Sequence, residues 1–381
     1  MSEKIGIPAA LMYHYYGPAW EVFFKSLGMK VLVSPDTNKK ILDEGVKMAV
    51  DDICLPFKVY YGHVNYLLEK VDYLFVPRFI SLGKGNFVCP KFMGLPNMLK
   101  AVIDRLPVLI EPVVDFRRGA YPAQNLALGI GRQLKKGIFI THRAYLRARK
   151  VQKQYEELLQ QGLSPKESRK IIKEKIASKK RDCEIVENSR RDSQDKRIGK
   201  LTKKDRGSER ITKSLKEEKD SLKIVVLGHA YLIYDSYISM ALLEHLIKRG
   251  SQIYTVEMFE PALLENAARK QAKRVFWFFN RRIMGGAYQA IYNLSNSLEA
   301  ENFSPEEKID GIIQVNSFGC SPDSIIKELV NIRGKNKQIP VLNICLDEHS
   351  GQAGLITRLE AFLELLERRN WNEKNNLSPH G

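Results

Sequence analysis

Two blocks of alternating apolar and amphipathic segments, separated by a charged tract, constrain the fold of this chain more than any other feature. In the first block, short apolar runs such as residues 4–8 and 73–77 alternate with stretches whose apolar residues recur at helical spacing. The second block begins abruptly at residues 223–228 and repeats this alternation up to residues 355–369. Strands and helices in this order predict βαβ units, so we expect an α/β fold with two doubly wound parallel sheets.

The length of 381 residues also favours two domains, because single domains typically have about 100–200 residues. Between the blocks, residues 181–222 contain no aromatic residue and few apolar ones, so they cannot bury enough surface to offset their ordering entropy. We therefore expect an N-terminal α/β domain (1–123), a helical connection (124–180), a charged flexible linker (181–222), a C-terminal α/β domain (223–372) and a tail (373–381).

The net charge of +17 is concentrated in this connecting region. Residues 143–223 contain 26 Lys and Arg against 14 Asp and Glu, a net charge of +12, which leaves only +5 for the rest of the chain. The tract is almost free of aromatic side chains that could stack on bases. A solvated basic helix face or linker explains it better than a nucleic-acid site, and we expect no nucleic-acid partner.

The sequence predicts a cytoplasmic protein without a membrane span. No apolar run approaches the roughly 20 residues that cross a bilayer, and residues 1–17 lack the basic and then apolar layout of a signal peptide. In that compartment the five cysteines stay reduced.

Three of the cysteines share a local pattern in which proline closely follows the thiol: Cys54-Leu-Pro56, Cys89-Pro90 and Cys320-Ser-Pro322. Proline suits the first turn of a helix, so each of these cysteines is expected at a helix N-terminus, where unpaired amides favour a thiolate. Three thiolates can hold a [4Fe-4S] cluster and leave one iron without a protein ligand.

Spacing alone leaves a second interpretation open, in which these cysteines are ordinary small apolar residues. The absence of a CxxC pair removes the main support for a zinc-ribbon or thioredoxin-type site. Cys345 lies in an apolar run and is expected in the core, whereas Cys183 is expected to be exposed in the linker.

Other candidates follow predicted strand ends, where ligands collect in open α/β sheets. The loop that begins at Asp347 joins a strand to a helix, so its amides could bind an anion, and in it Glu348 or His349 could carry protons. The alternative is that Asp347 and Ser350 only cap the loop and the helix. His229 either lines the same cleft or is a structural histidine.

Three further features have simpler explanations. Asp51 and Asp52 are expected to cap the helix after Cys54 rather than to tune a cluster. The aromatic run at residues 275–279 is expected in the core, and the glycines of residues 129–131 are too few for dinucleotide binding.

Several motifs in a fixed order resemble those of the 2-hydroxyacyl-CoA dehydratase component-like family, in particular its activase-related subset. The resemblance covers residues 1–115 and 223–370. The residues that carry it include Ile5-Gly-Ile-Pro8, Asp51-Asp-Ile-Cys54-Leu-Pro56, Gly62-His63, Cys89-Pro-Lys-Phe-Met-Gly-Leu-Pro96, Gly228-His229, Phe318-Gly-Cys320-Ser-Pro-Asp323 and Leu346-Asp-Glu-His349.

The resemblance implies two flavodoxin-like domains with a [4Fe-4S] cluster between them, held by Cys54, Cys89 and Cys320. It also implies that a separate ATPase of the actin-like superfamily delivers an electron, with which the dehydratases form a ketyl radical from a 2-hydroxyacyl-CoA thioester. A CoA thioester ligand and a second dehydratase-like subunit or homodimer are the further expected partners. The sequence contains no Walker-type phosphate loop, and its basic segment 181–222 departs from the shared core.

Two functional hypotheses follow. The first is a dehydratase-like iron-sulfur component of reductive CoA-thioester metabolism. The second is a noncatalytic electron-transfer or cluster-carrier subunit that docks on an ATPase or a dehydratase.

Overall fold

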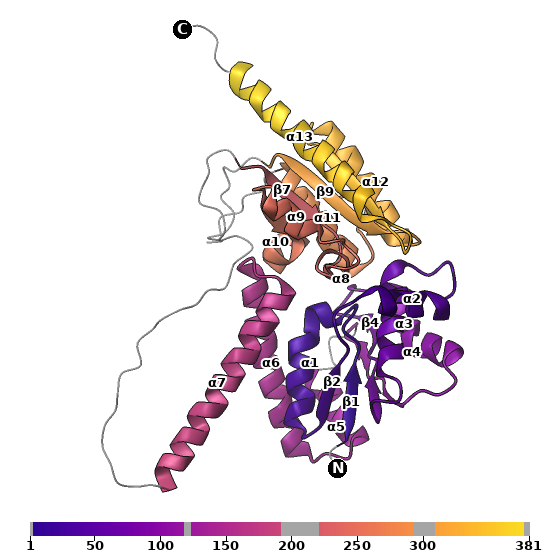
Figure 1. The fold of residues 1–381 in the computed structure, drawn as a ribbon, viewed down its shortest axis with the longest axis vertical. Coiled ribbons are helices and arrows are strands. Elements are labelled where there is room, and N and C mark those ends of the chain that lie inside the picture. Colours follow the sequence, from indigo (N-terminus) through magenta and orange to yellow (C-terminus); the bar gives the residue numbers. More distant parts are fainter. Residues whose placement is uncertain (1–2, 118–122, 192–220, 293–308, 377–381) are drawn as a thin grey trace.

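The fold is α/β, and the strands of its sheets are parallel. The computed structural model describes residues 3–117, 123–191, 221–292 and 309–376, with side chains for all of these except 179–191 and 373–376. Figure 1 shows two sheet-containing domains stacked end to end, with a pair of long helices beside the N-terminal one.

The N-terminal domain is built on a four-stranded sheet of order β2-β1-β3-β5. A second, two-stranded sheet pairs β4 with β6 in parallel. The strands of these two sheets are β1 (Lys4–Ile7), β2 (Lys30–Val33), β3 (Tyr73–Phe75), β4 (Arg78–Ser81), β5 (Val108–Ile110) and β6 (Val113–Asp115).

Helices cover both faces of this four-stranded sheet. Neighbouring residues of a strand point to opposite faces, so Leu74 joins the cluster that includes residues of α3 and α4, whereas Phe75 joins the cluster on α1, α5 and α6. The helices up to β5 are α1 (Tyr13–Ser26), α2 (Lys39–Met48), α3 (Leu55–Leu67) and α4 (Pro90–Val102).

Helix α1 begins at Tyr13, so Pro18 lies inside the helix rather than in its first turn. A proline within a helix has no amide hydrogen for the carbonyl four residues earlier, here that of His14. The Tyr155 hydroxyl donates to this carbonyl oxygen at 2.7 Å. Another helix therefore supplies the bond that Pro18 cannot make.

The helical connection consists of α5 (Ala123–Gln133), α6 (Ile138–Gln160) and α7 (Pro165–Arg191). A capping box precedes α7, because the Ser164 and Glu167 side chains each bond the other's backbone amide. Helix α7 runs beside α6 and continues to Arg191, into the segment expected to be a linker (Figure 1). Residues 192–220 of that segment lie outside the described residues.

The C-terminal domain has a four-stranded parallel sheet of order β10-β9-β7-β8. Its strands are β7 (Lys223–Leu227), β8 (Gln252–Thr255), β9 (Gly311–Ser317) and β10 (Val341–Leu346). The remaining elements are α8 (Ala230–Ile233), α9 (Leu242–Lys248), the 3-10 turn η1 (Val256–Met258), α10 (Pro261–Ala268), α11 (Phe278–Tyr292), α12 (Ser321–Asn336) and α13 (Gln352–Asn376).

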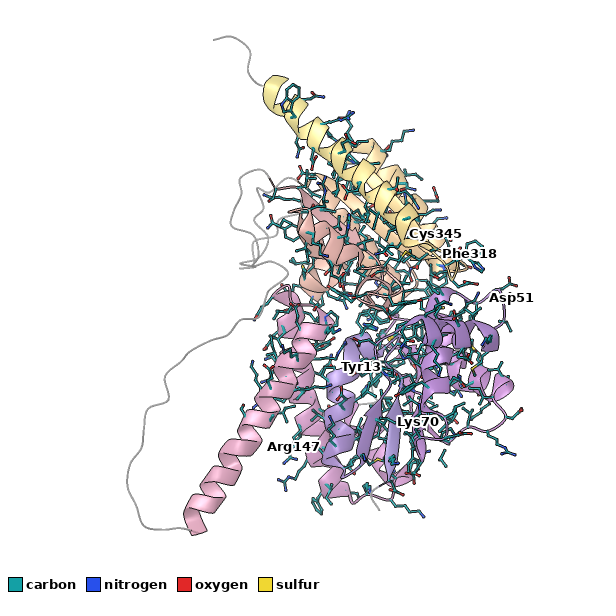
Figure 2. The ribbon with its side chains drawn as sticks, in the orientation of Figure 1. Tyr13, Asp51, Lys70, Arg147, Phe318 and Cys345 are labelled. Atoms are coloured by element: carbon teal, nitrogen blue, oxygen red, sulfur yellow. The ribbon has the colours of Figure 1, made fainter. Side chains whose placement is uncertain are left out.

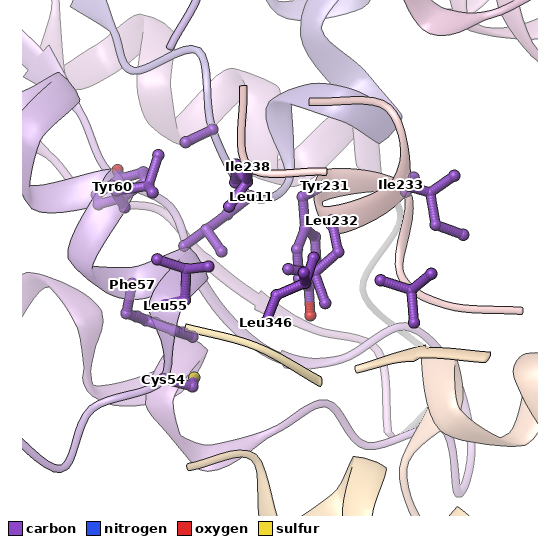
Figure 3. Close-up of a cluster of buried hydrophobic side chains, with 14 of the residues drawn as sticks. Leu11, Cys54, Leu55, Phe57, Tyr60, Tyr231, Leu232, Ile233, Ile238 and Leu346 are labelled. Atoms are coloured by element: carbon purple, nitrogen blue, oxygen red, sulfur yellow. The ribbon is translucent and has the colours of Figure 1, made fainter. Parts of the chain in front are cut away.

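One hydrophobic cluster is continuous across the two domains. It combines side chains of α3 with those of α8 and β10, and Cys54 is among its buried members. Figure 3 shows Leu55 and Phe57 of the N-terminal domain close to Tyr231 and Leu346 of the C-terminal domain. The domains therefore share apolar surface where the cysteine-bearing helices begin.

Within the described residues, no helix combines the length and the apolar character needed to cross a membrane.

Candidate functional site

The three proline-flanked cysteines occupy equivalent local positions, and their predicted place at helix N-termini is confirmed. Cys54 is the N-cap residue of α3, Cys89 of α4 and Cys320 of α12. In each helix the proline lies in the first turn, where its missing amide hydrogen costs no intrahelical bond. A proline shortly after the cysteine thus accompanies a cysteine N-cap in all three helices.

Contacts between the domains bring the segments of these cysteines together. The Leu55 amide donates to the Ser317 hydroxyl at 3.1 Å, which ties the start of α3 to the end of β9. The Lys91 ammonium lies 3.4 Å from both the Cys54 sulfur and the Gly319 carbonyl oxygen. One cation thus links α4, the N-cap of α3 and the loop before Cys320.

Gly319 has φ +72°, a conformation that side-chain-bearing residues rarely adopt. A Cβ atom there would lie 3.2 Å from the Asp52 carbonyl oxygen. Glycine therefore allows the Cys320 loop to approach the turn before Cys54 closely.

Burial dominates the electrostatics of the thiols. It raises the pKa of Cys54, Cys89 and Cys320, and the cation of Lys91 only partly opposes this for Cys54 and Cys89. Cys89 also raises the pKa of Cys54, and Cys54 raises that of Cys320. At these N-caps burial therefore opposes the thiolate that the helix N-termini were expected to favour.

In the described part of the chain, no group of three or more His, Cys, Asp and Glu side chains is arranged to hold a metal ion. The ligands of a site for one metal ion all point at that ion, and the thiols of Cys54, Cys89 and Cys320 are not arranged in this way.

A buried polar cluster lies next to Cys320. Asp323, in the first turn of α12, accepts hydrogen bonds from the His229 ring at 2.9 Å and from the Asn280 amide at 2.6 Å. His229 is only 5% exposed and stacks on Tyr231 with ring centroids 4.8 Å apart. Among the described residues, no nitrogen or oxygen atom pairs with its buried Nδ1 atom or with the buried Oδ2 atom of Asp323.

Glu348 and His349 occupy different environments. Glu348 forms an ion pair with Lys58, which lies one turn after Cys54 on α3. His349 is exposed, and its amide donates to the Asp347 carboxylate at 3.0 Å. The Ser350 hydroxyl also donates to that carboxylate, so Asp347 closes the loop as its capping interpretation predicts.

The predicted capping of α3 by Asp51 or Asp52 is wrong. The helix begins after Cys54, whose side chain makes no capping hydrogen bond, and its first amide, that of Leu55, donates to Ser317 instead. Both aspartates are exposed in the preceding turn, and Figure 2 shows Asp51 and Phe318 at the level where the two domains meet.

The two remaining cysteines differ from the candidate ligands. Cys345 is exposed, so its expected place in the core is wrong. It lies on β10, an edge strand, and alternate residues of this strand point away from the buried cluster. Cys183 falls in α7, where the side chains are not described.

Sequence reasoning missed how the Cys89 loop is held. Phe87 stacks on Phe276 with ring centroids 4.8 Å apart, and its carbonyl accepts from the Phe278 amide at 2.7 Å. Fully buried Arg281 also reaches across the domains to Asn86. The aromatic run expected in the core is therefore partly an interdomain contact, and Phe276 itself is exposed.

The family comparison matches the part of the chain that carries two of the three cysteines. The model of the CoA enzyme activase uncharacterised domain matches residues 4–259. The chain belongs to this family. The activase-domain match includes Cys54 and Cys89 and ends before Cys320, which follows β9 of the C-terminal sheet at the start of α12. A search of curated proteins finds no match.

Proposed function

We propose that this member of the activase-domain family is an iron-sulfur protein that holds a [4Fe-4S] cluster with Cys54, Cys89 and Cys320 between its domains. The observation that carries the proposal is the threefold repetition of one local arrangement, a cysteine N-cap followed by a proline, on helices that meet at the junction. The ligands of a four-iron cluster bind different irons, so they do not need to converge as the ligands of one ion do.

The environment of the thiols fits such a group. Cys54 is 5% exposed, which would exclude water, and Lys91 would offset part of the negative charge of bound thiolates. Because burial raises the thiol pKa values, loading would release protons from all three cysteines. When bound, the cluster would supply a one-electron carrier with one iron that has no protein ligand.

The domain architecture supports the same proposal. In each domain the strands of the four-stranded sheet follow the spatial order 2-1-3-4, which matches the start of the flavodoxin-like order. In such sheets, ligands bind beyond the carboxyl ends of the strands, and Cys320 follows the end of β9. We therefore propose two flavodoxin-like domains that enclose the cluster.

The reaction we propose is reductive chemistry on a CoA thioester, with the electron supplied by a separate ATPase of the actin-like superfamily. The family description, which names CoA and an activase, supports the link to CoA substrates. Near the thiols, His229 and Asp323 form a buried pair with unsatisfied polar atoms, and Glu348 is held by Lys58. Of these, His229 and Glu348 are the groups we propose for proton transfer.

A noncatalytic electron carrier is the second candidate. The observation that favours it is Phe318, which is 69% exposed two residues before Cys320. Exposed aromatic side chains are enriched where proteins dock on one another.

One anaerobic experiment separates these outcomes. The purified protein should contain about four iron and four sulfide ions per chain and give an electron paramagnetic resonance signal after reduction. A CoA thioester that changes this spectrum supports the enzyme, whereas an unchanged spectrum with electron transfer to a partner supports the carrier. Protein that binds no iron or sulfide after reconstitution would contradict both.

A further inference from the structure

A cavity of about 470 Å³ lies within the N-terminal domain, apart from the thiols. It is bounded by α1, α5 and α6 and by the segments that follow β3 and β5. None of Cys54, Cys89 and Cys320 lines it. The volume falls within the range of small-molecule sites, about 300–1,000 Å³.

The position of the cavity agrees with the general rule for open α/β sheets. Phe75 is the last residue of β3, and Pro112 lies just beyond the end of β5; both line the cavity. Ligands of such sheets collect at the carboxyl ends of the strands. The cavity therefore occupies a place where this architecture commonly binds small molecules.

One wall is apolar and largely aromatic. Tyr16 and Trp20, one turn apart on α1, stack with ring centroids 5.9 Å apart, and Tyr16 also stacks on Phe79 at 6.0 Å. Trp20 meets Phe75 edge to face at 5.0 Å. These mutual contacts fix the rings, so the wall is a preformed surface for a flat or extended apolar group.

A second wall is a polar face of α6. Its lining residues recur at helical spacing: Tyr145, Arg149, Gln152, Lys153 and Glu156. Arg149 has no hydrogen bond or ion pair to the described residues, whereas Lys153 pairs with Glu157 at 3.9 Å. The Gln152 amide donates to the Glu156 carboxylate at 2.9 Å, so Gln152 already engages the one acidic group of this face. Among the described residues, the cavity thus combines an apolar wall with a cation, Arg149, that has no acidic partner.

We propose that this cavity binds an amphipathic organic anion, with its acyl or aryl body against Trp20 and Phe79 and its carboxylate on Arg149. A guanidinium matches a carboxylate in geometry and charge, and the aromatic wall desolvates the apolar body. The proposal does not depend on the iron-sulfur cluster, because different residues form the two sites.

The test is calorimetric titration with sodium decanoate as the probe. The wild-type protein should bind it saturably, and decyltrimethylammonium, which has the same chain and the opposite charge, should bind more weakly. Arg149→Gln should weaken decanoate binding by about tenfold, as expected for loss of a charge-assisted hydrogen bond. Arg147→Gln is the matched control, because Arg147 is an exposed arginine on the same helix that does not line the cavity (Figure 2).

A second variant tests whether the ligand occupies the volume of this cavity. Ala123 is exposed at the mouth of the cavity, so Ala123→Trp should block binding without disturbing the core. Melting temperatures of the variants establish that they are folded. No saturable binding of decanoate to the wild-type protein below about 1 mM would overturn the proposal, as would equal effects of Arg149→Gln and Arg147→Gln. Unchanged decanoate binding in Cys54→Ala would show that this site is independent of the proposed cluster.

Discussion

Lys58 and Glu348 form an ion pair across the domain junction, although they are 290 residues apart in the chain. The Lys58 side chain is 5% exposed and that of Glu348 is 18% exposed, so the pair is largely removed from water. Lys58 lies one turn after Cys54, and Glu348 follows the end of β10. The pair therefore fixes the C-terminal sheet against the helix that presents the first candidate ligand.

Lys58→Met should lower the free energy of unfolding by about 2–4 kcal/mol, because it leaves the Glu348 carboxylate partly buried without a partner. Urea denaturation at neutral pH measures the loss. Lys58→Met combined with Glu348→Leu should recover most of it, since neither charge then remains. The control is Lys39→Met in the exposed pair with Asp43, which should cost less than about 1 kcal/mol.

The effect of Lys58→Met should also depend on pH. Burial alone would raise the pKa of Glu348, but the hydrogen bond from Lys58 holds it below its ordinary value. Such a carboxylate stabilises the fold above its unfolded pKa of about 4.3 and loses this effect as the pH falls through its lower folded pKa. The stability difference between wild type and variant should therefore persist at pH 5–7 and shrink below about pH 4. A difference that stays constant down to pH 3 would show that charge is not its cause.

Gly62→Ala should disturb the site through the packing of α2 against α3. An added Cβ would lie 1.8 Å from the Ile41 carbonyl oxygen, so the helices must separate and the N-terminus of α3 must shift. We expect lower stability and less bound iron. Gly129→Ala is the matched control, because nothing lies within 4 Å of its Cβ and alanine favours a helix by about 1 kcal/mol. Wild-type stability and iron content in Gly62→Ala would contradict the packing argument.

Replacing residues 193–219 with a Gly-Ser linker of equal length should leave the melting temperature nearly unchanged, because this stretch has few apolar residues to contribute to a core. Leu222, just after this stretch, serves as the contrasting control because its side chain is buried in the cluster shared by the two domains. Leu222→Ala should cost about 2–3 kcal/mol. A large drop in melting temperature for the linker variant alone would show that these residues pack.

Several elements could be predicted from the sequence because local pattern determines them. The strand at Val341–Leu346 and the helix starts behind Cys54, Cys89 and Cys320 follow from apolar runs and from proline after the cysteine. The start of α1 could not be predicted, because Pro18 lies inside the helix and the carbonyl that it leaves without an amide donor is bonded by Tyr155, far away in the sequence.

Contacts between residues far apart in the chain could not be predicted either, because no local sequence pattern determines them. Cys345 lies in an apolar run, and its exposure depends on β10 being an edge strand, which no local pattern reveals. The hydrogen bond from Thr37 to Asp235 likewise joins the two domains through short polar side chains. His63, which belongs to the motifs of the resemblance, holds Thr37 in place for this hydrogen bond. Its ring nitrogens lie 2.9 Å from the Ser34 hydroxyl and 3.0 Å from the Thr37 hydroxyl.

Because we propose that a separate ATPase supplies the electron, the isolated protein should hydrolyse ATP negligibly. A purified actin-like activase with ATP should reduce the bound cluster, and salt should slow this step if the basic helices α6 and α7 contribute to docking. Phosphate release and the visible absorption of the cluster measure the two steps. Rapid ATP hydrolysis by this chain alone would contradict the proposal and show that the chain is itself an ATPase.

The most direct test of the central claim is the iron content of five single cysteine variants after anaerobic reconstitution. Wild type, Cys183→Ala and Cys345→Ala should each retain about four irons per chain, whereas Cys54→Ala, Cys89→Ala and Cys320→Ala should each lose most of them. Equal iron content in all five variants, or a wild-type protein without iron, would contradict the account.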